Sequence, residues 1–485
     1  MTPDVMPNPD TPTDRRKGYR SHSPAERAAY GKAARKKTPR VALAHFSATS
    51  DRVDPIELLE EQAQNRLPAL VPIRYGRMAA SPFAFFRGAA LPMVSDLSTL
   101  PNSGLHVQLC GDAHLMNFGA FGTPERRLVF DINDFDETSV GPFEWDVMRL
   151  CASVAVASRE RGDDTATTEQ AVLATASSYR AEMAKYAGMS TLDVWYSRFD
   201  VEVFLKQITK DLKPSRAQGI NTSAVKKMRS RDSVKAAEQN TEMVDGLPRF
   251  ISNPPLQIRG TETGLSGVST QLGTLIDELH GRASIYRRTL SPERRHLFDE
   301  YRIVDVAMRV VGVGSVGTRC YILLLIGRDA NDPLILQVKE ANKSVLERYS
   351  VKSPFAHPGE RVVIGQKLTQ SASDLFLGWT DGHPPEGGTR SFYIRQFRDW
   401  KGSVEYADLQ VPAFTYYVRT CAWAIAKAHA RSGDQIAISA YVGSGNAFDR
   451  AMLSFALDYA DQTVTDHAAL IAAIDAGRIE ARTGI

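Results

Sequence analysis

Carboxylate and amide side chains gather in two short stretches of the sequence. In the first, CGDAHLMNFG, Asp112 is followed by His114 and, five residues after the aspartate, by Asn117. In the second, FDINDFDE, Asp134 and Asp136 lie two residues apart. Oxygen ligands of this kind suit Mg²⁺, and the spacing D-x-x-x-x-N is that of a phosphotransferase catalytic loop. The pattern predicts Asp112 and His114 as catalytic residues. The predicted metal ligands are Asn117, Asp134 and Asp136.

These two stretches follow apolar runs that are typical of buried strands, residues 105–110 and 127–132. Asp134-Phe135-Asp136 then stands where a kinase carries its D-F-G metal ligand. Asp and Asn are also common turn formers, which would explain one or two of these residues. Turn formation does not explain their joint spacing at the ends of two strands.

A glycine-rich run, VGVGSVG, lies much later in the chain and contains Gly312, Gly314, Ser315 and Gly317. G-x-G-x-x-G alone is a weak signal, and the dinucleotide-binding version requires a helix directly after the glycines. Here the β-forming run TRCYILLLIG follows instead. This favours a turn between antiparallel strands, whose backbone N–H groups cover nucleotide phosphates as in kinases. These four residues are therefore expected to bind ATP.

Lys339, in the apolar run LILQVKEA, occupies the place of the kinase lysine that pairs with the phosphates of ATP. A solvent-facing lysine on an edge strand is the alternative. A buried lysine needs a carboxylate partner, and Glu360 is the first choice, with Glu340 and Glu347 left open. Arg87 would either bind phosphate or an acidic substrate, or form a structural ion pair with the Asp-rich site.

The motifs stand in the wrong order for a kinase, because the catalytic loop at 110–117 precedes the glycine run and Lys339. A helix predicted at 412–431 comes last, although in phosphotransferases such a helix leads into the catalytic loop. A circular permutation would explain this order, and two unrelated domains with accidental motifs are the rival explanation. The predicted fold class is therefore α+β: a circularly permuted, protein-kinase-like two-lobed fold with a small antiparallel-sheet lobe and a larger helical lobe.

Four divisions of the chain follow from these patterns. We expect a basic, flexible arm at 1–45 and a helical lobe at 46–300 with a polar helical insertion near 205–250. An antiparallel-sheet nucleotide lobe is expected at 301–410, and helices completing the helical lobe at 411–485. Further helices are predicted at 54–66, 145–161, 165–188, 284–300 and 359–371, with an irregular segment over 71–90.

Composition limits the class of protein. The 485 residues carry a net charge of +3, and residues 1–40 hold ten basic against four acidic residues. A nucleic-acid partner is not favoured, since solvated basic tails are common. No apolar run is long enough to span a bilayer, the N-terminus lacks the apolar region of a secretory signal, and the four cysteines are widely spaced. We expect a cytoplasmic protein without a membrane partner; the oligomeric state is left open.

Several runs together resemble a bacterial family catalogued as domain of unknown function 2252. They are RYGRMAASPFAFFRGAA, CGDAHLMNFG, FDINDFDET, GPFEWDVMRL, VVGVGSVGTRCYILLL and LQVKEA. The loop GDAHLMN also resembles that of aminoglycoside and choline phosphotransferases, with Cys110 replacing their leading His, and Asp146 matches the Asp of their next helix. The family resemblance implies no particular reaction. The motifs predict a Mg²⁺- and ATP-dependent phosphotransferase acting on an unidentified hydroxyl acceptor. A nucleotide-binding pseudokinase switch and a metal-dependent phosphohydrolase are the alternatives.

Overall fold

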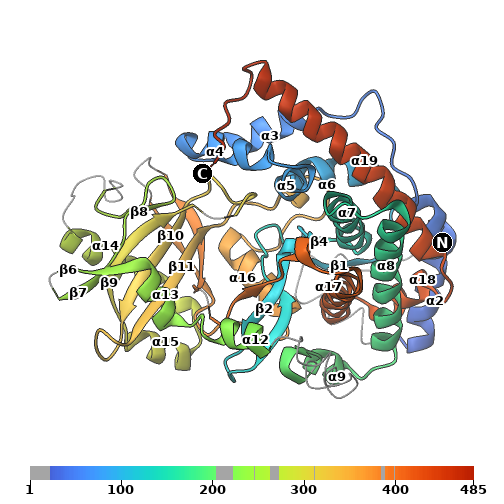
Figure 1. Ribbon diagram of the computed structural model, residues 1–485. Helices are drawn as coiled ribbons and strands as arrows, with labels where there is room; N and C mark the ends of the chain where they lie inside the picture. Colours follow the sequence, from blue (N-terminus) through green and yellow to red (C-terminus); the bar gives the residue numbers. More distant parts are fainter. Residues whose placement is uncertain are drawn as a thin grey trace.

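The computed structural model describes residues 22–203, 222–244, 246–262, 272–310, 312–383, 388–397 and 399–484. These residues form a mixed α+β architecture in which helices are joined to several small antiparallel sheets (Figure 1). The predicted α+β class is confirmed at this level.

The largest sheet has six antiparallel strands in the order β12-β13-β11-β10-β9-β8. Their bounds are β8 Gln257–Arg259, β9 Arg302–Arg309, β10 Cys320–Ile326, β11 Pro333–Glu340, β12 Gly378–Gly382 and β13 Arg390–Gln396. The antiparallel strands expected on either side of the glycine run are confirmed as β9 and β10, and β11 pairs antiparallel with β10 in turn. These strands read as continuous apolar runs because separate clusters of buried side chains cover the two faces.

Helices pack on both faces of this sheet, as the left half of Figure 1 shows. They are α13 Ser233–Asn240, α14 Leu272–Thr289, α15 Pro292–Asp299 and α16 Pro358–Thr369. Helix α16 contacts β12 and β13 on one side and the long helix α17, Val411–Ser432, on the other. It therefore joins the sheet to the helical half of the molecule. Strand β8 and helices α13, α14 and α15 precede residue 301, so the sheet half begins earlier in the chain than 301–410.

In the helical half, α17 packs against α7 Glu144–Glu160, α8 Thr165–Ala187, α9 Thr191–Tyr196 and α18 Gln435–Val442 (Figure 1). The other helices of this half are α2 Pro24–Lys37, α3 Pro55–Ala63, α4 Val71–Met78, α5 Pro82–Gly88, α6 Ala90–Ser98 and α19 Ala447–Asp475. The predicted helices at 54–66, 145–161, 165–188 and 412–431 correspond to α3, α7, α8 and α17. Most of α7 is buried, because α5, α8 and α19 all pack against it.

The remaining elements are short strands and 3₁₀ turns. The strands are β1 His106–Leu109, paired with β4 Ser139–Pro142, and a second sheet of β2 Phe118–Gly122, β3 Leu128–Ile132, β5 Phe199–Asp200 and β14 Gly402–Ser403. The 3₁₀ turns are η1 Arg40–Leu43, η2 Pro68–Leu70, η3 Leu115–Asn117, η4 Val345–Arg348 and η5 Tyr406–Asp408. The predicted strands at 105–110 and 127–132 correspond to β1 and β3.

The prediction of an irregular segment over 71–90 is wrong, because this segment forms α4 and α5. Pro72 and Pro82 each occupy the first turn of a helix, where the missing N–H is harmless, and Ser81 caps α5 by accepting from the Ala84 N–H. The prolines start helices here rather than break them.

The basic arm predicted at 1–45 and the polar insertion predicted near 205–250 lie only partly within the described residues. Residues 1–21 and 204–221 are outside them. From Ser23 the chain forms a capped helix, α2, that packs on α18 and pairs Arg27 with Asp434 at 2.8 Å, so this part of the arm is ordered. The described part of the insertion contains α12, Thr222–Arg229, and α13, but then forms the hairpin of β6, Thr241–Val244, and β7, Leu247–Phe250.

Candidate functional site

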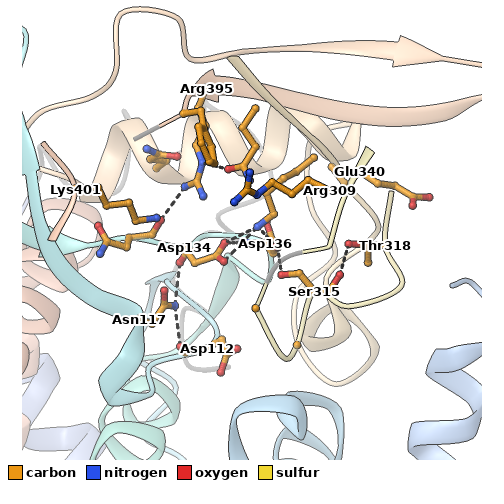
Figure 2. A pocket seen from close by; sticks show the side chains of 18 of the residues that line it. Asp112, Asn117, Asp134, Asp136, Arg309, Ser315, Thr318, Glu340, Arg395 and Lys401 are labelled. Carbon is orange, nitrogen blue, oxygen red and sulfur yellow. Dashed lines mark hydrogen bonds and ion pairs between the residues drawn. The ribbon is translucent and has the colours of Figure 1, made fainter. Parts of the chain in front are cut away.

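A cleft of about 1400 Å³ lies where the large sheet meets the loops that follow β1 and β3. Figure 2 shows side chains from both halves of the molecule converging on it. Of the residues predicted from the sequence, those that line the cleft are Arg87, Asp112, His114, Asn117, Asp134, Asp136, Gly312, Gly314, Ser315 and Lys339. Gly317 and Glu360 are not among the residues that line it.

The loop after β1 is fixed by the first turn of α7. The Asp146 carboxylate accepts the backbone N–H groups of Cys110 at 2.8 Å and Gly111 at 3.1 Å. Gly111 has a φ of +86°, and a Cβ there would lie 2.1 Å from the Glu137 carbonyl oxygen, so only glycine fits. His429, fully buried, lies with Nε2 3.3 Å from Asp146 and Nδ1 2.9 Å from the Tyr179 hydroxyl. It is the satisfied core histidine that its apolar helix indicates, and it orients the carboxylate that holds this loop.

Asp112 is held by an arginine that the sequence analysis did not single out. The Nε atom of buried Arg149, on α7, donates to Asp112 Oδ1 at 2.7 Å, and Nη2 contacts the same oxygen. The guanidinium also lies over the Phe86 ring, 4.5 Å from its centre. A signal was present, because an arginine on the otherwise apolar helix EWDVMRLCASVAVA needs a partner for its charge.

His114 lies beside Asp112, with its Nε2 atom 3.6 Å from Asp112 Oδ2. Burial lowers the pKa of His114 to about 4, and although Asp112 opposes this, the charges of Arg87 and Arg149 add to it. The imidazole is therefore neutral near pH 7, and it can accept or donate one hydrogen bond without adding charge.

Asn117 joins the two acidic loops. Its side-chain nitrogen donates to the carbonyl oxygens of Asp112 at 2.9 Å and Asp134 at 3.2 Å (Figure 2). Both bonds use the amide nitrogen, which leaves the amide oxygen as the atom that could bind a cation.

Lys339 reaches across the cleft from β11 to the second acidic loop. Its ammonium lies 3.2 Å from Asp134 Oδ2 and 2.6 Å from Asp136 Oδ2, although the two acids are about 200 positions away in the sequence. Asp136 also accepts the Tyr393 hydroxyl at 2.7 Å. Lys339 is only 2% exposed, so it is not the solvent-facing lysine that was the alternative.

The charges of this cluster are mutually dependent. Burial alone would lower the pKa of Lys339, but Asp134 and Asp136 outweigh it and raise that pKa well above its usual value. Burial likewise opposes ionisation of Asp134, yet Lys339 and Arg395 hold its pKa below the ordinary range. The pKa of Asp136 is raised, by burial and by the charge of Asp134. The lysine is thus charged, and the carboxylates of Asp134 and Asp136 both stabilise its charge.

The expected pairing of Lys339 with Glu360 is wrong in this structure, and the two other candidates have different partners. Glu340 pairs with Arg319 at 3.2 Å, and Glu347 lies 3.6 Å from Arg361. The carboxylates that satisfy Lys339 are those predicted as metal ligands.

The glycine run connects β9 to β10, and residues from other parts of the chain donate hydrogen bonds to its backbone carbonyls. Gly312 and Gly317 have φ values of +67° and +90°, which favour glycine. The carbonyl of Gly312 accepts from Arg77, and the Gly317 carbonyl accepts the Leu67 N–H at 2.8 Å. On the cleft side, the Ser315 hydroxyl lies 3.5 Å from Asp136 Oδ2 (Figure 2). The loop is thereby placed above the acidic cluster.

Arg395 adds a further positive charge to the cleft and was also missed from the sequence. It donates to the Asn133 carbonyl at 2.9 Å and to Gln337 Oε1 at 3.1 Å. In the β11–β13 pairing, Gln337 is opposite Arg395 and Lys339 is opposite Tyr393. Residues two apart on a strand share a face, so these four side chains all lie on the cleft face of the sheet. The alternation Tyr-x-Arg in the strand SFYIRQF could have indicated that Tyr393 and Arg395 share a face.

The residues that could hold a divalent cation are few. In the part of the chain that the structure describes, no three or more His, Cys, Asp and Glu side chains are grouped as a metal site. Asp134 and Asp136 with the amide oxygen of Asn117 form a smaller oxygen set. That set fits Mg²⁺, which typically takes one or two protein carboxylates and completes its shell with phosphate oxygens and water.

The sequence of the chain matches a bacterial family. The chain is a member of the family described as "Uncharacterized protein conserved in bacteria (DUF2252)", whose sequence profile matches residues 66–473. That range includes every cleft residue discussed above. No curated protein and no solved structure matched the chain. Within the described residues, no helix is both long and apolar enough to cross a membrane.

Proposed function

We propose that this protein is a Mg²⁺- and ATP-dependent phosphotransferase with a kinase-like two-lobed fold in circularly permuted order. One observation carries the proposal: Lys339, on the second strand after the glycine run, meets Asp134 across a cleft that also contains Asp112 and Asn117. Lys339 is 205 positions from Asp134 in the sequence, so chance is a poor explanation for its place beside these two loops.

A second observation supports the permuted order. The Ser432 hydroxyl at the end of α17 accepts the Gln108 N–H of β1 at 3.1 Å. A Cβ on Gly433 would lie 2.5 Å from Val107 and 3.2 Å from the His106 carbonyl. Helix α17 therefore leads in space into the strand before the catalytic loop, although β1 precedes it by more than 300 residues in the chain.

In the proposed reaction, each cleft residue has a distinct task. Asn117, Asp134 and Asp136 would hold Mg²⁺, which neutralises negative charge on the phosphates. Lys339 would exchange part of its contact with the carboxylates for the phosphates of ATP, and the Gly312–Gly317 loop would cover them.

Asp112 would orient the acceptor hydroxyl and receive its proton. The hydroxyl oxygen forms a bond to the γ-phosphorus, the bond from that phosphorus to the β,γ-bridging oxygen breaks, and ADP leaves. Arg149 and the neutral imidazole of His114 position Asp112. Catalysis would come mostly from placement and charge neutralisation.

A nucleotide-binding switch is the second candidate, and the contact between Arg149 and Asp112 favours it. An arginine bound directly to a catalytic aspartate engages one of its two oxygens. A phosphohydrolase is less well supported, because hydrolysis needs neither a glycine-rich loop nor Lys339.

Calorimetry and turnover measurements on matched variants test the proposal. MgATP should bind to the wild type and lose at least about tenfold in affinity in Asp134→Asn and Lys339→Ala, because charged partners of a desolvated phosphate are removed. Asp112→Asn should bind MgATP normally but lose about 10²-fold or more in ATP turnover or in phosphate transfer to a cell-extract metabolite pool. Unchanged turnover in Asp112→Asn with intact binding would favour the switch. Absence of MgATP binding in the wild type would refute both.

A further inference from the structure

Arg87 is a charged residue in the cleft without a countercharge in contact. It belongs to the last turn of α5, is half-buried, and lines the cleft together with Asp112 and His114. Its Nε atom is buried without a hydrogen-bond partner. Among the described residues, no carboxylate forms an ion pair with its guanidinium.

Other arginines that line the cleft have partners. Arg348 pairs with Glu61 at 2.9 Å, Arg395 donates to Gln337, and Arg77 donates to the glycine run. Asp112, the acid whose charge acts most strongly on Arg87, is already in direct contact with Arg149. The part of the cleft around Asp112 therefore has two positive charges, Arg87 and Arg149, beside one carboxylate.

The backbone that carries Arg87 is held in place. Arg74, fully buried, donates to the carbonyl of the next residue, Gly88, at 3.0 Å and to Gln62 at 2.7 Å. From the other side, a Cβ on Gly314 would lie 3.2 Å from the Arg87 carbonyl oxygen, so the glycine run packs against it. The guanidinium therefore starts from a fixed backbone position, and its fork of N–H groups favours planar, two-point recognition of an oxyanion.

We infer that Arg87 binds an anionic group, a carboxylate or a phosphate, on the acceptor itself. This rests on the proposed phosphotransferase function and narrows its substrate class to hydroxyl compounds that carry a second, negatively charged group. The anion on Arg87 would orient the acceptor so that its hydroxyl faces Asp112 and the γ-phosphate. The proton, the new phosphorus–oxygen bond and the departing ADP are as in the proposed reaction.

The test uses inorganic phosphate as a probe of the full-length protein. The nucleotide site is first filled with Mg²⁺ and the β,γ-imido analogue of ATP, and phosphate is then titrated by calorimetry. Arg87→Gln should weaken phosphate binding by about tenfold or more, as expected for loss of charge-assisted hydrogen bonds. Arg348→Gln is the matched control: it removes an arginine from the same cleft that already has a carboxylate partner, and phosphate affinity should not change.

The outcomes separate this inference from the proposed function. Phosphate binding that is absent from the wild type, or equal in Arg87→Gln, overturns the anion site, whether or not the nucleotide binds. Arg87-dependent phosphate binding in a protein that binds no nucleotide leaves the anion site standing and removes the phosphotransferase. If Arg87→Gln does not fold, Arg87→Lys decides, since lysine keeps the charge but not the two-point contact and should lower the affinity. Unchanged affinity in that variant overturns the inference.

Discussion

Replacing Lys339 by methionine tests the charge arrangement at the centre of the cleft. Methionine keeps much of the side-chain volume but leaves Asp134 and Asp136 facing each other without their shared cation. Breaking a buried ion pair costs about 3–5 kcal/mol. The two carboxylates are 36% and 29% exposed in their side chains, so water offsets part of this cost and about 2–3 kcal/mol is expected. With an unfolding entropy of about 2 cal/mol/K per residue, the chain of 485 residues should lose about 2–3 °C in Tm.

The same variant should gain a response to Mg²⁺. In the wild type the Lys339 ammonium lies between the oxygens that the metal would use, so Mg²⁺ without nucleotide has to compete with it. In Lys339→Met these oxygens lose the cation nearest to them, although Arg395 still acts on Asp134. At about a hundredfold excess over its Kd, Mg²⁺ should return about 2.7 kcal/mol, which is close to the whole loss.

Thermal unfolding with and without Mg²⁺, and with excess chelator, measures both effects. Lys343→Met is the matched control, because Lys343 lines the same cleft but is exposed. Its Tm should stay within about 0.5 °C of the wild type, since surface substitutions of this kind change stability little. Equal Tm values for the two variants, or a Mg²⁺ response no larger in Lys339→Met than in the wild type, would refute the reasoning about this cluster.

Three further substitutions address buried charged residues of α7. Arg149→Leu should lower turnover by about tenfold or more while MgATP affinity stays unchanged, because only Asp112 loses its orienting contact; steady-state kinetics and calorimetry separate the two effects. Burial raises the pKa of Glu144 from 4.5 to about 7, so between these values the native state binds a proton that the unfolded chain has lost, and stability falls as pH rises. Glu144→Gln should remove that slope, worth up to about 3 kcal/mol, in urea unfolding at the two ends of the window. Asp146→Asn should accelerate hydrogen exchange at the backbone amides of Cys110 and Gly111, which donate to its carboxylate, and no change there would contradict its role in fixing the loop after β1.

The features that could be predicted from the sequence were those set by short stretches of chain. Asp112 and Asn117 belong to one loop, and its spacing was enough to place them near each other. Strands β9, β10 and β11 were recognisable because β-branched and apolar runs alternate with glycine-rich turns. The α4–α5 segment was misread for a local reason too, since proline both starts and breaks helices and only its position in the turn decides.

The partner of Lys339 could not be predicted, because it depends on how α16 is rotated against the cleft. Successive helical residues point about 100° apart. The residue directed toward the acidic loop is Arg361, which donates to the carbonyls of Asp136 and Asn342 at 2.7 Å. Glu360, one position earlier, therefore points elsewhere. The rotation of a helix about its axis decides which side chain reaches the site, and this rotation cannot be read from the spacing of residues in the sequence.

The proposed permuted order agrees with how the site is held together. The Lys427 ammonium of α17 forms a fully buried ion pair with Asp131 of β3, three residues before Asp134. The Ser371 hydroxyl, just after α16, donates to the same carboxylate at 2.9 Å. The loop proposed to bind metal is thus supported by elements that follow it by more than 200 residues. These contacts between distant parts of the chain hold the site together, whatever the order of its motifs along the sequence. A rearranged kinase-like order is therefore compatible with one intact cleft.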